Sequence, residues 1–273
     1  MIPSSTILAC VLTLCISLVI PLGILLVLGI RWRKDGFAPA WFIGAAGFFV
    51  TQMVIRLPIL SLLSANTGFV AFAQEHFILY SLLLAFTAGL FELAGRFAAG
   101  KLLKKKPTFR RALAAGLGHG SIEAILLVGI TYINNLIYLV LIQTGAFDTL
   151  VAQTEAMGVD PSQLLAIKET FLQTGAGLFL LAGLERLLTM VAHTAMSVLM
   201  CWGLWSHRTG IGVTACLVIH TLLDSMVMVT YLVPQPASYW ILYGFMGLVA
   251  LFSLYLLRRL RNTWPACEKG ESV

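Results

Sequence analysis

Charged residues are scarce in this sequence. Aspartate, glutamate, lysine and arginine make up 11% of the 273 residues, and hydrophobic residues make up 59%, whereas about a quarter of an ordinary soluble domain is charged. A soluble core cannot bury so much apolar surface, so most of this chain must have lipid as its solvent. The apolar runs also lack the polar alternation of membrane-barrel strands. The composition therefore predicts an all-α, polytopic transmembrane helical bundle.

Cysteine motifs and processing signals are also lacking. The five cysteines show no CxxC spacing, which argues against both a disulfide framework and a redox motif. No lysine or arginine precedes the first apolar run, so we expect a retained first span rather than a cleaved signal peptide. The last three residues, Glu-Ser-Val, do not form a prenylation signal.

Apolar runs predict about seven spans, which we assign to a single transmembrane domain over residues 1–273. They lie near residues 6–30, 38–62, 77–100, 112–141, 172–205, 210–233 and 238–257. Crossing a ~30 Å hydrocarbon core takes roughly 20 residues. The fourth and fifth runs are longer than this, so we expect them to tilt, or to break near the glycines at 116–120 and 175–183. The polar insert at about 142–171 is expected to be an outer loop with a short helix.

Basic residues follow alternate spans. Lysines and arginines cluster after the first, third, fifth and seventh runs, whereas segments 63–76, 142–171 and 234–237 contain only one lysine between them. This alternation is the positive-inside pattern and predicts an outer N-terminus and an inner C-terminus. We interpret the net charge of +6 mainly as this topology signal, and we expect no nucleic-acid partner because the basic residues are dispersed at helix ends.

Ten ionisable residues remain inside the predicted spans. They are Arg56, Glu92, Arg96, His119, Glu123, Glu185, Arg186, His193, His220 and Asp224. Each costs on the order of 2.5–3.5 kcal/mol in hydrocarbon even on lenient insertion scales. They must therefore face one another or a water-filled cavity, and they are the candidates for function.

Depth along the spans divides these residues into two groups. A rise of ~1.5 Å per residue from the basic inner boundaries places Glu92, His119, His193 and His220 about 12–18 Å deep, on four helices. Arg56 and the Glu185–Arg186 pair fall nearer the outer side, where a structural ion-pair cluster is the favoured interpretation. In the inner group, three pairs have i,i+4 spacing and so share a helical face: Glu92–Arg96, His119–Glu123 and His220–Asp224.

The inner group predicts a zinc site. Three imidazoles at one depth (His119, His193 and His220) match a catalytic zinc site, which has three protein ligands and an open position for water. Glu92 or Glu123 would take a proton from that water, Asp224 would orient His220 through its other ring nitrogen, and Arg96 would compensate the charge of Glu92. The alternative interpretation is that intramembrane histidines simply hydrogen-bond between helices.

Four segments resemble the YhfC family of intramembrane metalloproteases, which is similar to the CAAX-protease and PrsW-like superfamily. They are FELAGRF (91–97), GLGHGSIEAI (116–125), LERLLTMVAHTAMS (184–197) and VIHTLLDS (218–225), and the motif-bearing core covers about 90–225. TQMVIRLP (51–58) adds weaker support. The resemblance assigns the glutamate motif with its arginine to Glu92 and Arg96, and the histidine motifs to His119, His193 and His220, with Glu123 and Asp224 beside them. It implies zinc-dependent peptide cleavage inside the membrane.

One position departs from the superfamily pattern. The first motif commonly carries two adjacent glutamates, and counting back from Arg96 puts Phe91 in the first place and Glu92 in the second. If the first glutamate is the group that activates water, then either this chain is impaired or Glu92 takes over the role.

The leading functional hypothesis is a metal-dependent intramembrane endopeptidase that uses a metal- or glutamate-activated water on a membrane-associated peptide or protein substrate. Proton-coupled secondary transport is an alternative, because chains of histidine and carboxylate also relay protons, although no internal repeat supports it. A non-catalytic, protease-derived membrane scaffold is another. We expect a multi-pass protein of the bacterial cytoplasmic membrane, in contact with lipid; the sequence leaves substrate and oligomeric state open.

Overall fold

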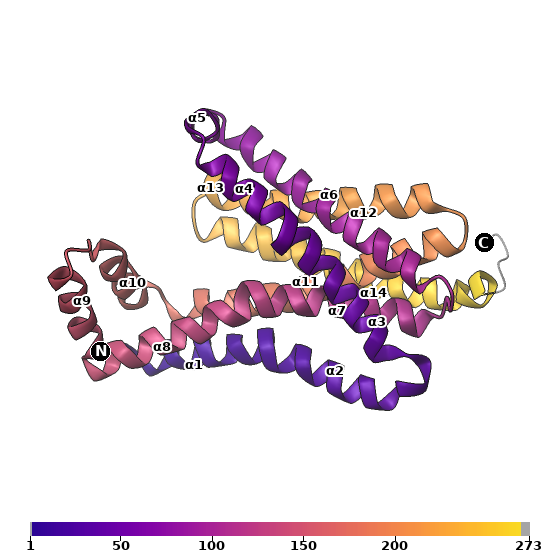
Figure 1. Ribbon diagram of the computed structural model, residues 1–273, viewed down its shortest axis with the longest axis horizontal. Coiled ribbons are helices and arrows are strands. Elements are labelled where there is room, and N and C mark those ends of the chain that lie inside the picture. The colour runs from indigo at the N-terminus through magenta and orange to yellow at the C-terminus, as the bar shows by residue number, and fades with distance from the viewer. Residues whose placement is uncertain (1, 269–273) are drawn as a thin grey trace. The chain divides into compact units, whose positions relative to one another are not determined.

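The computed structural model describes residues 2–268, which are almost entirely helical and contain no β-strand (Figure 1). Fourteen α-helices follow one another along the described chain. They are α1 (Ser4–Leu14), α2 (Ile20–Arg31), α3 (Phe37–Phe48), α4 (Leu57–Ser64), α5 (Thr67–Glu75), α6 (Phe77–Leu103), α7 (Phe109–Glu123), α8 (Ile130–Thr144), α9 (Ala146–Ala156), α10 (Ser162–Gln173), α11 (Ala176–Trp205), α12 (Thr209–Ser225), α13 (Val229–Leu232) and α14 (Ala237–Glu268).

Seven membrane-length helical segments confirm the predicted all-α, seven-span class. They are Ser4–Arg31, Phe37–Ser64, Phe77–Leu103, Phe109–Thr144, Ala176–Trp205, Thr209–Leu232 and Ala237–Trp264. The side of the membrane on which each terminus lies stays a prediction of the charge pattern.

Three spans contain a π-helical segment, and neither the fourth nor the fifth span breaks at its glycines. These segments are Cys15–Val19 between α1 and α2, Phe49–Arg56 between α3 and α4, and Ala124–Gly129 between α7 and α8. The fourth span therefore continues through its glycines and widens only after Glu123, and α11 runs unbroken from Ala176 to Trp205. The backbone satisfies its hydrogen bonds in these wider turns, as a lipid environment demands.

The chain divides into two compact units, residues 1–22 with 124–187, and residues 23–123 with 188–273. In the first unit, buried side chains of α1, α8, α10 and α11 form the core, and the carbonyl of Phe179 accepts hydrogen bonds from both Thr13 Oγ1 and Tyr132 Oη, each at 2.8 Å. The insert 142–171 contributes two helices here, α9 and α10, joined by a Lys168–Asp148 ion pair. The assignment of the whole chain to a single domain stays a prediction.

The second unit holds the candidate site. Here α3 packs on α7 and on α6, and α6 packs on α12. Its apolar core is formed by α3, α6, α7, α11, α12 and α14. This packing brings together four helices that each carry at least one of the ionisable residues predicted from the sequence.

Candidate metal centre

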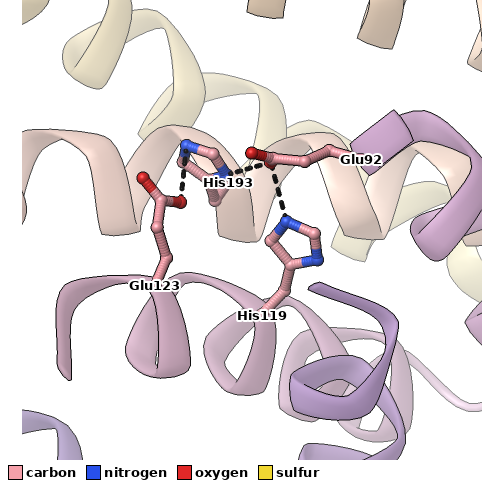
Figure 2. Close-up of side chains that lie close together, drawn as sticks. All are labelled: Glu92, His119, Glu123 and His193. Carbon is pink, nitrogen blue, oxygen red and sulfur yellow. Dashed lines mark hydrogen bonds and ion pairs between the residues drawn. The ribbon is translucent and has the colours of Figure 1, made fainter. Parts of the chain in front are cut away.

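Glu92 of α6 is the centre of a buried polar cluster. Its Oε2 atom lies 2.9 Å from His119 Nε2, 3.3 Å from His193 Nδ1 and 3.5 Å from His220 Nδ1. These histidines come from α7, α11 and α12, and each is at most 3% exposed. Figure 2 shows Glu92 placed between His119 and His193, with its carboxylate directed at both rings. Ring nitrogens of three helices therefore converge on one small space.

Two of the histidines carry a second carboxylate on their other ring nitrogen. Glu123 Oε2 lies 3.2 Å from His193 Nε2 (Figure 2), and Asp224 Oδ2 lies 3.2 Å from His220 Nε2. A carboxylate in this position fixes the tautomer and the orientation of a metal-binding histidine. The His220 pair thus has the geometry that would present Nδ1 to a metal ion, whereas Nδ1 of His193 lies 2.6 Å from Arg96 NH2.

Arg96 lies one turn after Glu92 on α6. Its NH2 group donates to Glu92 Oε2 at 2.9 Å and to His193 Nδ1 at 2.6 Å, and only 2% of the residue is exposed. A buried carboxylate needs a cationic or hydrogen-bonding partner, because removing one member of a buried pair costs about 3–5 kcal/mol. Arg96 supplies that partner and links Glu92 to His193.

Gln52 is a site residue that the sequence analysis missed. It lies in the π-helical segment Phe49–Arg56 and is 5% exposed. Its Nε2 donates to Glu92 Oε1 at 2.9 Å and to the Ala88 carbonyl at 3.3 Å. Its Oε1 accepts from Arg56 NH1 at 3.3 Å, which fixes the orientation of the amide. A search for ionisable residues does not find a neutral amide. The position of Gln52, four residues before Arg56, nevertheless indicates that the two side chains share a helical face.

Arg56 belongs with this cluster through Gln52. Its guanidinium also donates to the Leu84 carbonyl at 2.8 Å and to Thr87 Oγ1 at 3.4 Å. Depth counting groups it with Glu185 and Arg186, which form an ion pair with each other. The hydrogen bonds of Arg56 run instead to Gln52 and α6, because proximity depends on which helix faces meet as well as on depth.

Glycines bring the backbones of the site helices into contact. A Cβ atom on Gly118 would lie 1.9 Å from the Trp41 carbonyl oxygen of α3, and one on Gly116 would lie 2.7 Å from the Thr194 carbonyl oxygen of α11. The glycine-rich segment around His119 is expected from its sequence to let backbones approach closely, and these glycines set how near α7 comes to its neighbours. His119 is the residue after Gly118 and is therefore held where α7 meets α3 and α11.

The donor set fits a metal ion. Glu92, His119, Glu123 and His193 each offer a ligand atom within 4.8 Å of the others; His220 is outside this tightest group but approaches the same Glu92 oxygen. Imidazole nitrogens and carboxylate oxygens are zinc ligands. Within residues 2–268, His220 Nδ1 and the Nε and NH1 atoms of Arg96 are buried without a hydrogen-bond partner. Buried polar groups rarely remain unpaired. His220 Nδ1 could therefore bind an ion, whereas the two Arg96 groups are donors only and could bind a water but not a cation.

The structure therefore brings together all seven residues that the sequence predicts for the metal site. Glu92, Arg96, His119, Glu123, His193, His220 and Asp224 all belong to one connected network of contacts within the second unit. Their chemical roles stay predictions. Seven membrane-length helices with a buried histidine–carboxylate group that could hold a metal define a multi-pass integral membrane protein with a candidate metal centre.

Comparison with known proteins gives the family. The model of the YhfC intramembrane metalloprotease family matches residues 16–246, and the chain belongs to this family. "Uncharacterized membrane protein YhfC" of Bacillus subtilis (strain 168) is 27% identical over 197 residues, which are 71% of this chain and 73% of the relative. No solved structure gives a significant match.

Proposed function

We propose that this protein is a zinc-dependent intramembrane endopeptidase. One observation carries the proposal: ring nitrogens of His119, His193 and His220 converge within 3.5 Å of Glu92 Oε2 inside a membrane-spanning bundle. Three imidazoles and a carboxylate are side chains of the kinds that catalytic zinc sites use. Membership of a family described as intramembrane metalloproteases supports the same reaction class.

The bound zinc would polarise the scissile carbonyl and make a water acidic enough to be a nucleophile at neutral pH. We assign the proton-accepting role to Glu92, because its Oε2 lies within 3.5 Å of a ring nitrogen of each of the three histidines. Gln52 holds the other oxygen of Glu92, and Arg96 keeps its charge compensated. This assignment makes Glu92 sufficient although Phe91 stands where the wider superfamily has a glutamate.

Glu123 and Asp224 would act as orienting groups. Each contacts the ring nitrogen opposite the one directed at Glu92, so neither needs to contact the water. Of the two glutamates, we therefore propose Glu92 as the base. It also leaves a direct test, because an orienting carboxylate tolerates replacement by an amide better than a base does.

The substrate we propose is a peptide segment of a membrane-associated protein, since the site lies on membrane-spanning helices. Membrane lipid is the other partner, covering exposed side chains such as Trp240, Leu248 and Leu62. We place the protein in the bacterial cytoplasmic membrane, consistent with a relative in Bacillus subtilis.

Metal analysis of the purified protein tests the proposal. Wild-type protein should retain about one zinc per chain, and His119→Ala and His220→Ala should lose most of it. His76→Ala is the matched control, because His76 lies between α5 and α6, where its ring contacts Phe72. Equal and negligible zinc in the wild type and both site variants would refute the metalloprotease assignment. Equal zinc binding by all four proteins would mean that the metal binds at another site.

A further inference from the structure

A cavity with charged residues in its wall adjoins the candidate metal centre. It encloses about 360 Å³ between α6, the π-helical segment before α4, and the segment from α12 to α13. Its wall includes Arg56, Tyr80, Ser81, Asp224, Val227 and Tyr231. The volume is in the lower part of the ~300–1,000 Å³ range of ligand pockets.

Two of the wall residues connect directly to the site. Asp224 Oδ2 contacts His220 Nε2 at 3.2 Å, and Arg56 contacts Gln52, which donates to Glu92. Ala88, also in the wall, supplies the carbonyl that Gln52 contacts. The cavity wall therefore contacts His220 through Asp224 and reaches Glu92 through Arg56 and Gln52.

The charges in the wall show what kind of molecule the cavity accepts. The Asp224 side chain is 41% exposed although it lies in a membrane span, and such a group must face water or a polar ligand rather than lipid. Arg56 has only donors and Asp224, when ionised, only acceptors. Two tyrosines and a serine line the same wall together with apolar residues.

We propose that this cavity is the subsite that binds the substrate backbone next to the bond to be cleaved, an inference that rests on the proposed endopeptidase function. An extended peptide carries one N–H donor and one C=O acceptor on each residue. Its N–H groups can donate to Asp224 beside His220, and its C=O groups can accept from Arg56 in addition to Gln52, Leu84 and Thr87. A lipid acyl chain can satisfy neither. The cavity of about 700 Å³ in the first unit, walled by Leu178, Leu181, Leu184 and other apolar groups, is the kind of surface that suits an acyl chain.

Binding of three hydroxamates to the zinc-loaded, detergent-solubilised protein tests the subsite. Acetohydroxamate presents only the metal-binding group, trialanyl hydroxamate adds a peptide, and hexanohydroxamate adds an alkyl chain. We expect trialanyl hydroxamate to bind at least tenfold more tightly than the other two. Ser81→Trp, which fills the cavity from α6, should remove this advantage and leave the affinity for acetohydroxamate unchanged.

The controls separate this inference from the proposed function. Leu83→Trp lies two residues away, on a lipid-facing position that is 42% exposed, and should keep the tenfold preference. Val227→Trp fills the cavity from the other wall if Ser81→Trp fails to fold. Equal affinity for the peptide and alkyl hydroxamates, or a preference that survives both filling variants, would overturn the subsite. Failure of the wild type to bind zinc would instead overturn the proposed function.

Discussion

Gly118→Ala offers the most direct test of how backbone packing maintains the candidate metal centre. The new Cβ would lie 1.9 Å from the Trp41 carbonyl oxygen and 2.7 Å from its carbon, where ordinary contacts begin near 3.4 Å. Backbone cannot rotate away as a side chain can, so α3 and α7 must separate by about 1.5 Å. Overpacking of this kind costs about 1–3 kcal/mol.

The same displacement would move His119, the next residue along α7. Metal sites require ligand distances within about 0.2 Å of their ideal values, so a shift of even half the required separation is large for the site. We therefore expect Gly118→Ala to lower zinc affinity at least tenfold as well as lower the melting temperature. Zinc competition with a chromophoric chelator and thermal unfolding in detergent measure the two effects.

Gly244→Ala is the matched control for this substitution. Gly244 lies within α14, and a Cβ there would meet nothing within 4 Å. The added methyl group should leave zinc affinity unchanged and favour the helix by about 0.5–1 kcal/mol. If Gly118→Ala matches Gly244→Ala in both measurements, the close approach of α3 and α7 does not control the site and the reasoning fails.

Three further predictions concern the site and the topology. Gln52→Leu should weaken zinc binding by about 10–100-fold, the usual effect of losing an outer hydrogen bond, as measured by chelator competition. Glu92→Gln should abolish cleavage of a model membrane peptide by at least about 100-fold, whereas Glu123→Gln should lower zinc affinity by no more than tenfold and retain cleavage. In intact cells, a membrane-impermeant thiol reagent should label Ser162→Cys in the insert and leave Lys105→Cys unlabelled, because the positive-inside pattern puts them on opposite sides.

Each of these predictions has an outcome that contradicts it. Unchanged zinc binding in Gln52→Leu, relative to the lipid-facing Val54→Leu, would remove Gln52 from the site. A cleavage loss in Glu123→Gln as deep as in Glu92→Gln would return the base to an open choice between the two glutamates. Labelling of Lys105→Cys in preference to Ser162→Cys would reverse the predicted orientation.

Hydropathy predicts the fold class well because every span must cross the same hydrocarbon layer. Each span needs about 20 apolar residues, and a run of that length can be read directly from the sequence. The ionisable site residues were equally visible, since a charge such as Glu92 is costly in hydrocarbon wherever the helix faces. This cost explains why the seven predicted site residues lie together. An ionisable side chain in a membrane span is stabilised only when it contacts another polar group.

The features that sequence reasoning missed depend on three dimensions. Gln52 carries no charge and so falls outside a search for ionisable groups, although it donates to Glu92. Depth counting places Arg56 with Glu185, but which faces of two helices meet is decided by the glycine contacts and the π-helical turns. The insert also forms two helices, α9 and α10, where one short helix was expected.

The π-helical segment Phe49–Arg56 has a consequence for how this protein tolerates insertions and deletions. A wider turn adds a residue to the helix without lengthening the path across the membrane, and each residue turns an α-helix by about 100°. The glycine face of α3, where Gly44 meets Ala115 and Gly47 meets Gly95, therefore has a fixed rotational phase relative to Gln52. Deleting a single residue here would leave a span that is still long and apolar enough to cross the membrane. The deletion would rotate Gln52 relative to the glycine face of α3, so the glycine contacts and the Gln52–Glu92 hydrogen bond could not both form. Phase, rather than length, is the property of this span that the site depends on.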